Sequence, residues 1–300
     1  MKDTARGETG LRLGLMVFSI VALGFLILII FGPTPEPPDQ STGAPGSPTE
    51  LLDVLHDHGS REAIELLKSV SPASFAQLDT VARNAIDDGA GAEALSVVLL
   101  EALFAQFQGQ AAYIKAADSA GFQSILAGLA DGLEQLKRSD SDWCDGEVIA
   151  AFLSQNDADL VPSLLTEFHY GSPQYVWAME WMTTVLSAAQ QGQARPRQYQ
   201  RPGFRDEAIL QQEGLALGSE QWGLGLQIAA FANSEGTSYS TMQEVIAGMD
   251  VCDLGIAVNT VSGRLPTEVR ARIWSDLMPE IMIGNTPYVM YRVTDYFFIG

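Results

Sequence analysis

An arginine-rich segment is the most unusual chemical feature of the sequence. Residues 193–205 have the sequence QARPRQYQRPGFR, in a chain with 37 acidic and 17 basic residues and a formal net charge of −20. Guanidinium groups bind carboxylates and phosphates through paired hydrogen bonds, and a tyrosine adds an aromatic face. The pattern indicates a docking segment for an acidic partner, a phosphate or a carboxylate-bearing polymer. Its candidate binding residues are Arg195, Arg197, Tyr199, Arg201 and Arg205.

The same segment has a second interpretation. Exposed basic side chains in an acidic protein can find partners on the protein's own surface. The arginines would then hold two halves of the protein together, and the sequence leaves both interpretations open. Pro196, Pro202 and Gly203 interrupt helices, so either interpretation makes 193–205 a boundary between helical regions.

The two cysteines of the chain, Cys144 and Cys252, are 108 positions apart. Neighbouring aspartates disfavour a thiolate, so neither cysteine fits a catalytic nucleophile. In an oxidising compartment they could form a disulfide, and a loop of this length would stabilise the folded state by up to about 4–5 kcal/mol. Two buried free thiols are the alternative.

A carboxylate between two tryptophans, Glu180 between Trp177 and Trp181, suggests a general acid of a glycan hydrolase acting on peptidoglycan. Such chemistry needs a second carboxylate across a cleft, and the sequence identifies none. An amphipathic helix with its tryptophans in the core explains the same residues. We therefore predict no catalytic residue and no cofactor, and we keep a glycan hydrolase or glycan-binding protein as the alternative function.

Metal and nucleic-acid sites find little support. His56 and His58 are two positions apart, so on a helix they point to different faces. Segment 139–147 is acidic but departs from the calcium-binding loop pattern, since Cys144 and Asp145 replace required residues. We predict no metal site. The net charge of −20 also argues against binding of DNA or RNA.

The elements that position these residues begin with a membrane anchor. Residues 13–31 carry no charge, and about 20 apolar residues span a bilayer. The apolar part of a cleavable signal peptide is shorter and ends at a small-residue cleavage site. Three basic residues precede the run and none follows until Arg61. The positive-inside rule then places residues 1–12 in the cytoplasm, with a transmembrane helix over 13–32. We expect a single-pass protein of the bacterial inner (plasma) membrane whose body is periplasmic or otherwise extracytoplasmic.

Beyond the anchor, residues 33–48 contain six prolines and form an extended linker of up to ~50 Å. Apolar residues then recur every three or four positions, most clearly over 91–107 and 121–136. These patterns predict an all-α body, either a helical bundle or stacked helix hairpins. A helix is expected over 253–262, although residues 255–261 would also suit a short strand. The expected division is helical region one over 49–192, the loop 193–205, and helical region two over 206–300.

Together these features predict a membrane-anchored acidic helical interaction or scaffold protein of the cell envelope, or an accessory subunit of a membrane complex. Its expected partners are the membrane, through the anchor, and another envelope or membrane protein.

Overall fold

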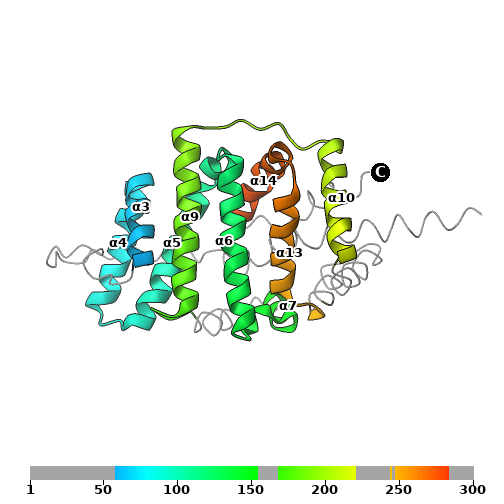
Figure 1. Cartoon of the computed structure of the whole chain (residues 1–300). Coiled ribbons are helices and arrows are strands. Elements are labelled where there is room, and N and C mark those ends of the chain that lie inside the picture. The colour runs from blue at the N-terminus through cyan, green and yellow to red at the C-terminus, as the bar shows by residue number, and fades with distance from the viewer. Residues whose placement is uncertain (1–57, 155–167, 221–243, 245–246, 284–300) are drawn as a thin grey trace, which may run out of the picture.

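The computed structural model describes residues 58–154, 168–220, 244 and 247–283 (Figure 1). All the regular structure in these residues is helical, apart from one isolated bridge between Asp145 and Asp250. The elements are α3 (His58–Val70), α4 (Pro72–Asp87), α5 (Ala92–Lys115), α6 (Ser119–Arg138), η1 (Asp142–Cys144), α7 (Gly146–Ser154), α9 (Pro173–Ala194), α10 (Phe204–Glu220), α13 (Val251–Arg264) and α14 (Thr267–Met282). The predicted all-α class is confirmed for this part of the chain.

The predicted anchor at 13–32 and the linker at 33–48 lie outside the described residues. Among the helices that the structure does describe, none combines the length and the hydrophobicity needed to cross a bilayer. The membrane anchor therefore stays a prediction from the sequence.

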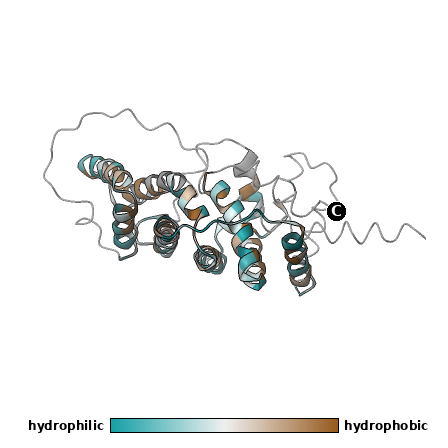
Figure 2. Cartoon of the chain, turned by 90° about the horizontal axis from the view of Figure 1, so that it is seen from above, coloured by the Kyte–Doolittle hydropathy of each residue, from teal (hydrophilic) through white to brown (hydrophobic). Residues whose placement is uncertain are grey.

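The helices form two packed layers. One layer has the spatial order α3, α9, α6, α13, α10, and the other has the order α4, α5, α14 (Figure 1; Figure 2 looks along the helices). Contacts of α3 with α4, of α9 with α5 and of α6 with α14 join the layers. Helices from both sides of 193–205 share one hydrophobic core. The order in the first layer differs from the order in the chain, because α9 lies between α3 and α6.

Helix α6 shows how the sequence specifies these elements. The Asp118 side chain accepts a hydrogen bond from the Gly121 amide at 2.8 Å and so caps the first turn. Lys137 and Arg138 lie in the last turn, where positive charge is favourable. Apolar residues at three- and four-residue spacing are all buried: Phe122, Ile125, Leu126, Leu129, Leu133 and Leu136.

The contact between α6 and α9 is close because a glycine faces a tryptophan. A Cβ atom at Gly132 would lie only 1.7 Å from the Trp177 ring. The indole N–H groups of Trp177 and Trp181 donate to carbonyl oxygens of α6, at 2.8 and 2.9 Å. Both tryptophans therefore pack against α6 with their polar atoms satisfied.

Residues 255–261 belong to helix α13, so the helix expected over 253–262 is confirmed and the alternative of a short strand is wrong. The Asp250 side chain caps this helix by accepting from the Asp253 amide at 2.9 Å. Residues Leu254, Val258 and Val261 are buried on one face, at the spacing of a helix. Packing of this face against α6 decides the conformation of a short apolar segment that would also suit a strand.

Helix α9 packs closely on α5 at Gly192. A Cβ atom there would lie 1.9 Å from the Tyr113 carbonyl oxygen, and a backbone atom cannot rotate away. We expect Gly192→Ala to destabilise the fold by about 1–3 kcal/mol, as overpacking does. In Gly109→Ala the new methyl group meets nothing within 4 Å, and the change should be neutral or slightly stabilising. Urea unfolding of both variants measures the difference, and equal stabilities would contradict the packing described.

Candidate functional site

The arginine-rich segment forms an extended connection, residues 195–203, which we call the strap. It runs from the end of α9 across one end of the molecule to the start of α10 (Figure 1). Since α10 packs on α13 and α9 on α6, the strap must pass both α6 and α13. The strap therefore spans three helix-to-helix distances, from α9 to α6, from α6 to α13 and from α13 to α10. At about 8–10 Å each, they add up to roughly 24–30 Å. Nine extended residues cover ~30 Å, so the strap has little slack.

Backbone and aromatic contacts hold the strap in place. The Arg197 amide donates to the Ala116 carbonyl oxygen at 2.9 Å, and the Tyr199 hydroxyl donates to the Ala117 carbonyl oxygen at 2.9 Å. The Tyr199 ring lies against Phe122, with ring centroids 6.2 Å apart. Pro202 is buried. The strap is thus fixed to the turn between α5 and α6 without using any guanidinium group.

Tyr199 has a structural role in this arrangement. Burial raises the pKa of its hydroxyl above the ordinary value, and the nearby Asp118 carboxylate raises it further. The hydroxyl therefore keeps the proton that it donates to Ala117. The sequence suggested a stacking face for a partner at this residue, but the ring is packed partly against Phe122 instead.

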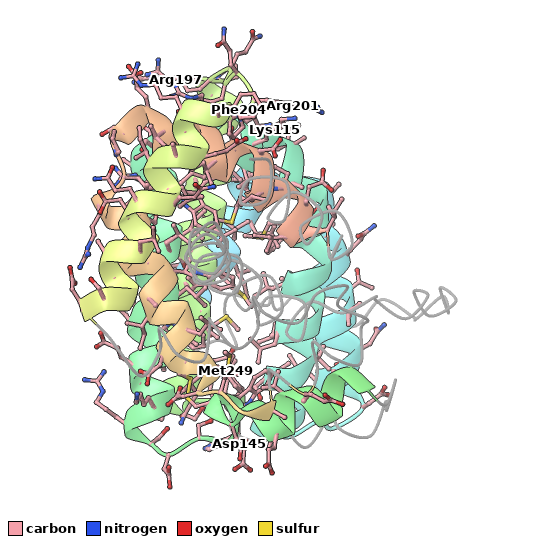
Figure 3. The ribbon with its side chains drawn as sticks, turned by 90° about the vertical axis from the view of Figure 1, so that its right-hand side faces the viewer. Lys115, Asp145, Arg197, Arg201, Phe204 and Met249 are labelled. Carbon is pink, nitrogen blue, oxygen red and sulfur yellow. A yellow bond between two sulfur atoms is a disulfide. The ribbon has the colours of Figure 1, made fainter. Side chains whose placement is uncertain are left out.

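The four arginines predicted as binding residues point away from these contacts. Their side chains are exposed and make no hydrogen bond or ion pair with the part of the chain that the structure describes. Lys115, at the end of α5, is exposed at the same end of the molecule (Figure 3). We use the name strap surface for the surface formed by five cations: Lys115, Arg195, Arg197, Arg201 and Arg205.

Phe204 adds an apolar group to the strap surface. It begins α10 between Arg201 and Arg205, and it is 72% exposed. Figure 3 shows Phe204, Arg197, Arg201 and Lys115 at the same end of the molecule, with Asp145 at the other end. Phe204 and Lys115 were not among the residues predicted from the sequence. The exposure of Phe204 depends on where α10 packs, which the sequence does not reveal. The only available sequence signal was the position of Phe204 directly after Pro202 and Gly203, which placed it in the loop.

An ion pair beneath the strap fixes the start of α10. The Asp206 carboxylate accepts two hydrogen bonds from the Arg272 guanidinium of α14, at 2.9 and 2.6 Å. The Asp206 side chain is only 9% exposed, and it also accepts from the Gly203 amide at 3.2 Å. The Arg272 hydrogen bond is the main reason that the pKa of Asp206 is lowered from its ordinary value.

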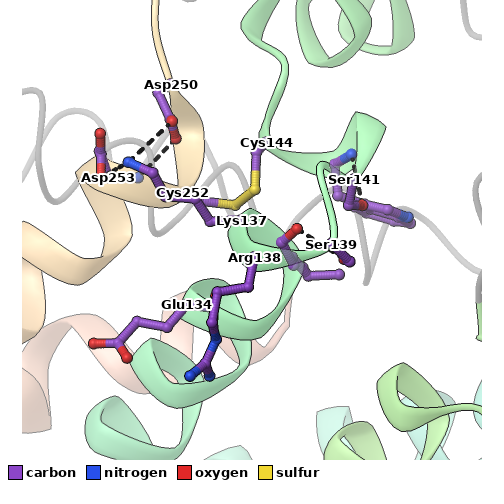
Figure 4. The surroundings of a disulfide bond; sticks show 11 residues. Glu134, Lys137, Arg138, Ser139, Ser141, Cys144, Asp250, Cys252 and Asp253 are labelled. Carbon is purple, nitrogen blue, oxygen red and sulfur yellow. Dashed lines mark hydrogen bonds and ion pairs between the residues drawn. A yellow bond between two sulfur atoms is a disulfide. The ribbon is translucent and has the colours of Figure 1, made fainter.

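The disulfide lies at the opposite end of the molecule. Cys144 and Cys252 are bonded, with their Cα atoms 4.9 Å apart, and the bond joins η1 to the start of α13 (Figure 4). The Gly146 amide donates to the Met249 carbonyl oxygen at 3.0 Å beside it. Of the two alternatives for the cysteines, the structure has the bonded one, so their sulfur atoms carry no thiolate for a metal or a substrate.

Lys137 strengthens the same connection. It pairs with Asp253 through a short contact and with Asp250 at 3.4 Å (Figure 4). The hydrogen bond to Asp253 is the largest cause of the raised pKa of the Lys137 ammonium group.

The carboxylate suggested as a catalytic acid lies in an unfavourable place for that chemistry. Glu180 is exposed on α9, while Trp177 and Trp181 are turned into the core. The tryptophans therefore do not form an apolar pocket around its carboxylate.

Comparison with protein-family models, with curated proteins and with solved structures finds no match for this chain.

The Asp206–Arg272 pair predicts a pH dependence. Because folding lowers the pKa of Asp206, its stabilising contribution is present above the ordinary carboxyl pKa and is lost as the pH falls through the lowered value. At pH 7, Asp206→Asn should destabilise the protein by about 2 kcal/mol, typical of a hydrogen-bonded charged group. Urea unfolding at pH 7 and near pH 3 should show this difference shrinking in acid. A difference that does not change with pH would contradict the assignment.

Proposed function

We propose that the protein is a membrane-anchored helical scaffold of the cell envelope that acts by binding, with the strap surface as its contact for anionic groups. One observation carries the proposal. Five exposed cations lie together at one end of a chain of net charge −20, and none forms an ion pair with the described residues.

Several of the other described cations provide the contrast, whereas Arg138 and Arg270 bond only uncharged acceptors. Arg83 pairs with Asp79, Lys137 with Asp253, Arg264 with Glu220 and Arg272 with Asp206. In a protein with so many carboxylates, such pairing is the ordinary outcome. The strap cations form no ion pair with a described carboxylate, although Arg205 lies near enough to Asp206 to help lower its pKa. They are available to a partner, and complementary charge both speeds and orients association.

Two features support a place in the cell envelope. The uncharged run at 13–31, followed by a proline-rich linker, has the composition of an anchor and a spacer. The Cys144–Cys252 disulfide is typical of oxidising compartments outside the cytoplasm. In the chain-entropy model, closing a loop of 108 residues stabilises the folded state by up to about 4–5 kcal/mol.

A glycan hydrolase is not favoured by any observation. Its suggested acid, Glu180, is exposed and lies on the side of α9 that faces away from the core tryptophans. Hydrolysis of a glycosidic bond needs a pair of carboxylates across a cleft, and no such pair is apparent around Glu180 among the described residues. Binding of an anionic partner accounts for the exposed cations of the strap surface and needs no catalytic residues.

Charge reversal tests the proposal directly. The full chain, solubilised in mild non-ionic detergent, is applied at low salt to a sulfonate cation-exchange resin. We expect retention despite the net charge of −20, because the strap surface presents its cations together. The double variant Arg197→Glu, Arg201→Glu should flow through the resin.

The matched control is Arg61→Glu, Arg138→Glu, which changes the net charge equally at two exposed positions on α3 and α6. It should be retained like the unaltered chain. The proposal is wrong if the unaltered chain is not retained, or if both double variants lose retention to the same extent.

A further inference from the structure

The position of the strap and the residues that it exposes indicate which kind of anionic partner can contact the strap surface. The strap crosses the outside of one end of the molecule, beyond the ends of the helices that it passes (Figure 1). Its cations therefore stand on a protruding connection. A row of charges on a protruding connection can contact a flat partner, such as a membrane surface, without a groove.

Phe204 points to the nature of that flat partner. A phenylalanine that is 72% exposed, between Arg201 and Arg205, combines an apolar ring with guanidinium groups on both sides. This is the chemistry of the lipid interface, where rings enter the boundary between headgroups and acyl chains while arginines remain at the phosphates.

We infer that the strap surface binds the phosphates of anionic lipid headgroups, in the membrane that holds the chain's own apolar segment at 13–32. The inference rests on the proposed membrane anchor. Binding turns the strap end of the body toward the bilayer, with Phe204 entering the interface, and turns the disulfide end away from it.

Part of the protein's negative charge lies far from this contact. Glu268, beside Arg272, is exposed near the strap, but a group of exposed carboxylates lies at the disulfide end: Asp140, Asp142, Asp145 and Glu147. Helix α6 separates the two ends, and its 20 residues span ~30 Å. The Debye length at physiological salt is only about 8 Å, so repulsion between these carboxylates and the lipid is screened over more than three Debye lengths.

The proline-rich linker is long enough for the strap end of the body to face the bilayer. The sixteen residues of 33–48 reach up to ~50 Å when extended, which exceeds the ~30 Å length of α6, so either end of the body can meet the bilayer. A tether of this kind gives an effective concentration in the millimolar range. Each basic residue near an anionic leaflet increases the affinity for the membrane surface about fivefold. At a millimolar effective concentration, five such residues are sufficient to hold the strap end at the bilayer.

The experiment measures which end of the body lies near the lipid. The full chain is placed in nanodiscs of phosphatidylcholine alone, or with about 30% phosphatidylglycerol to give a negative surface potential. Both native cysteines are in the disulfide, so a dye on Gln200→Cys in the strap is unique. The matched site is Glu134→Cys, exposed near the far end of α6. Energy transfer to a headgroup-labelled lipid reports proximity.

We expect transfer from position 200 to rise at least twofold from neutral to anionic discs, while transfer from position 134 does not rise. High salt, or Arg197→Glu with Arg201→Glu, should remove the increase, since both weaken attraction to the phosphates. Phe204→Ser should reduce it without changing retention on the sulfonate resin, because that substitution leaves every cation in place.

Equal transfer from position 200 in neutral and anionic discs would overturn the inference. If the chain is nevertheless retained on the sulfonate resin, the strap surface serves an acidic protein instead, and the proposed function stands. If the chain does not incorporate into discs at all, the proposed membrane anchor fails, and the inference fails with it.

Discussion

The position of α9 between α3 and α6 is the constraint on which the rest of the structure depends. Because α10 packs on α13 at the outer edge, the chain must cross two helices in nine residues. A helix of nine residues would span only ~14 Å, so the connection has to be extended. Pro196 and Pro202 favour that conformation. An extended crossing at the end of the molecule is also what exposes four arginines together.

The contacts that hold the strap are separate from the groups that it presents. Arg197 contributes its backbone amide, Tyr199 its ring and hydroxyl, and Pro202 its buried ring, while the guanidinium groups remain in solvent. Below the strap, Asp206 and Arg272 fix α10 to α14. At the far end, a disulfide and the Lys137 ion pairs fix the start of α13. The surface charges of the strap can therefore vary with little cost to the fold.

Local patterns predicted the helices well, because capping residues and the spacing of apolar residues act within one element. The apolar spacing recognised over 91–107 and 121–136 lies in α5 and α6. The strand suggested over 255–261 is wrong because contact with α6 decides the conformation of that segment, and no pattern within the segment encodes this contact. The arginines could be recognised as candidate binding residues from composition alone. The exposure of Phe204 and the ion pair between Asp206 and Arg272 could not, because both depend on how the helices are ordered in space, and no local sequence pattern encodes that order.

The account requires the strap to be a fixed element and not a loose loop, and hydrogen exchange measures this residue by residue. The Arg197 amide donates to Ala116, whereas the amides of Gln198, Gln200 and Arg201 donate to no acceptor in the part of the chain that the structure describes. NMR-detected exchange should therefore show the Arg197 amide protected by about tenfold or more relative to these three, after correction for intrinsic rates. Equal, fast exchange of all four amides would contradict the account.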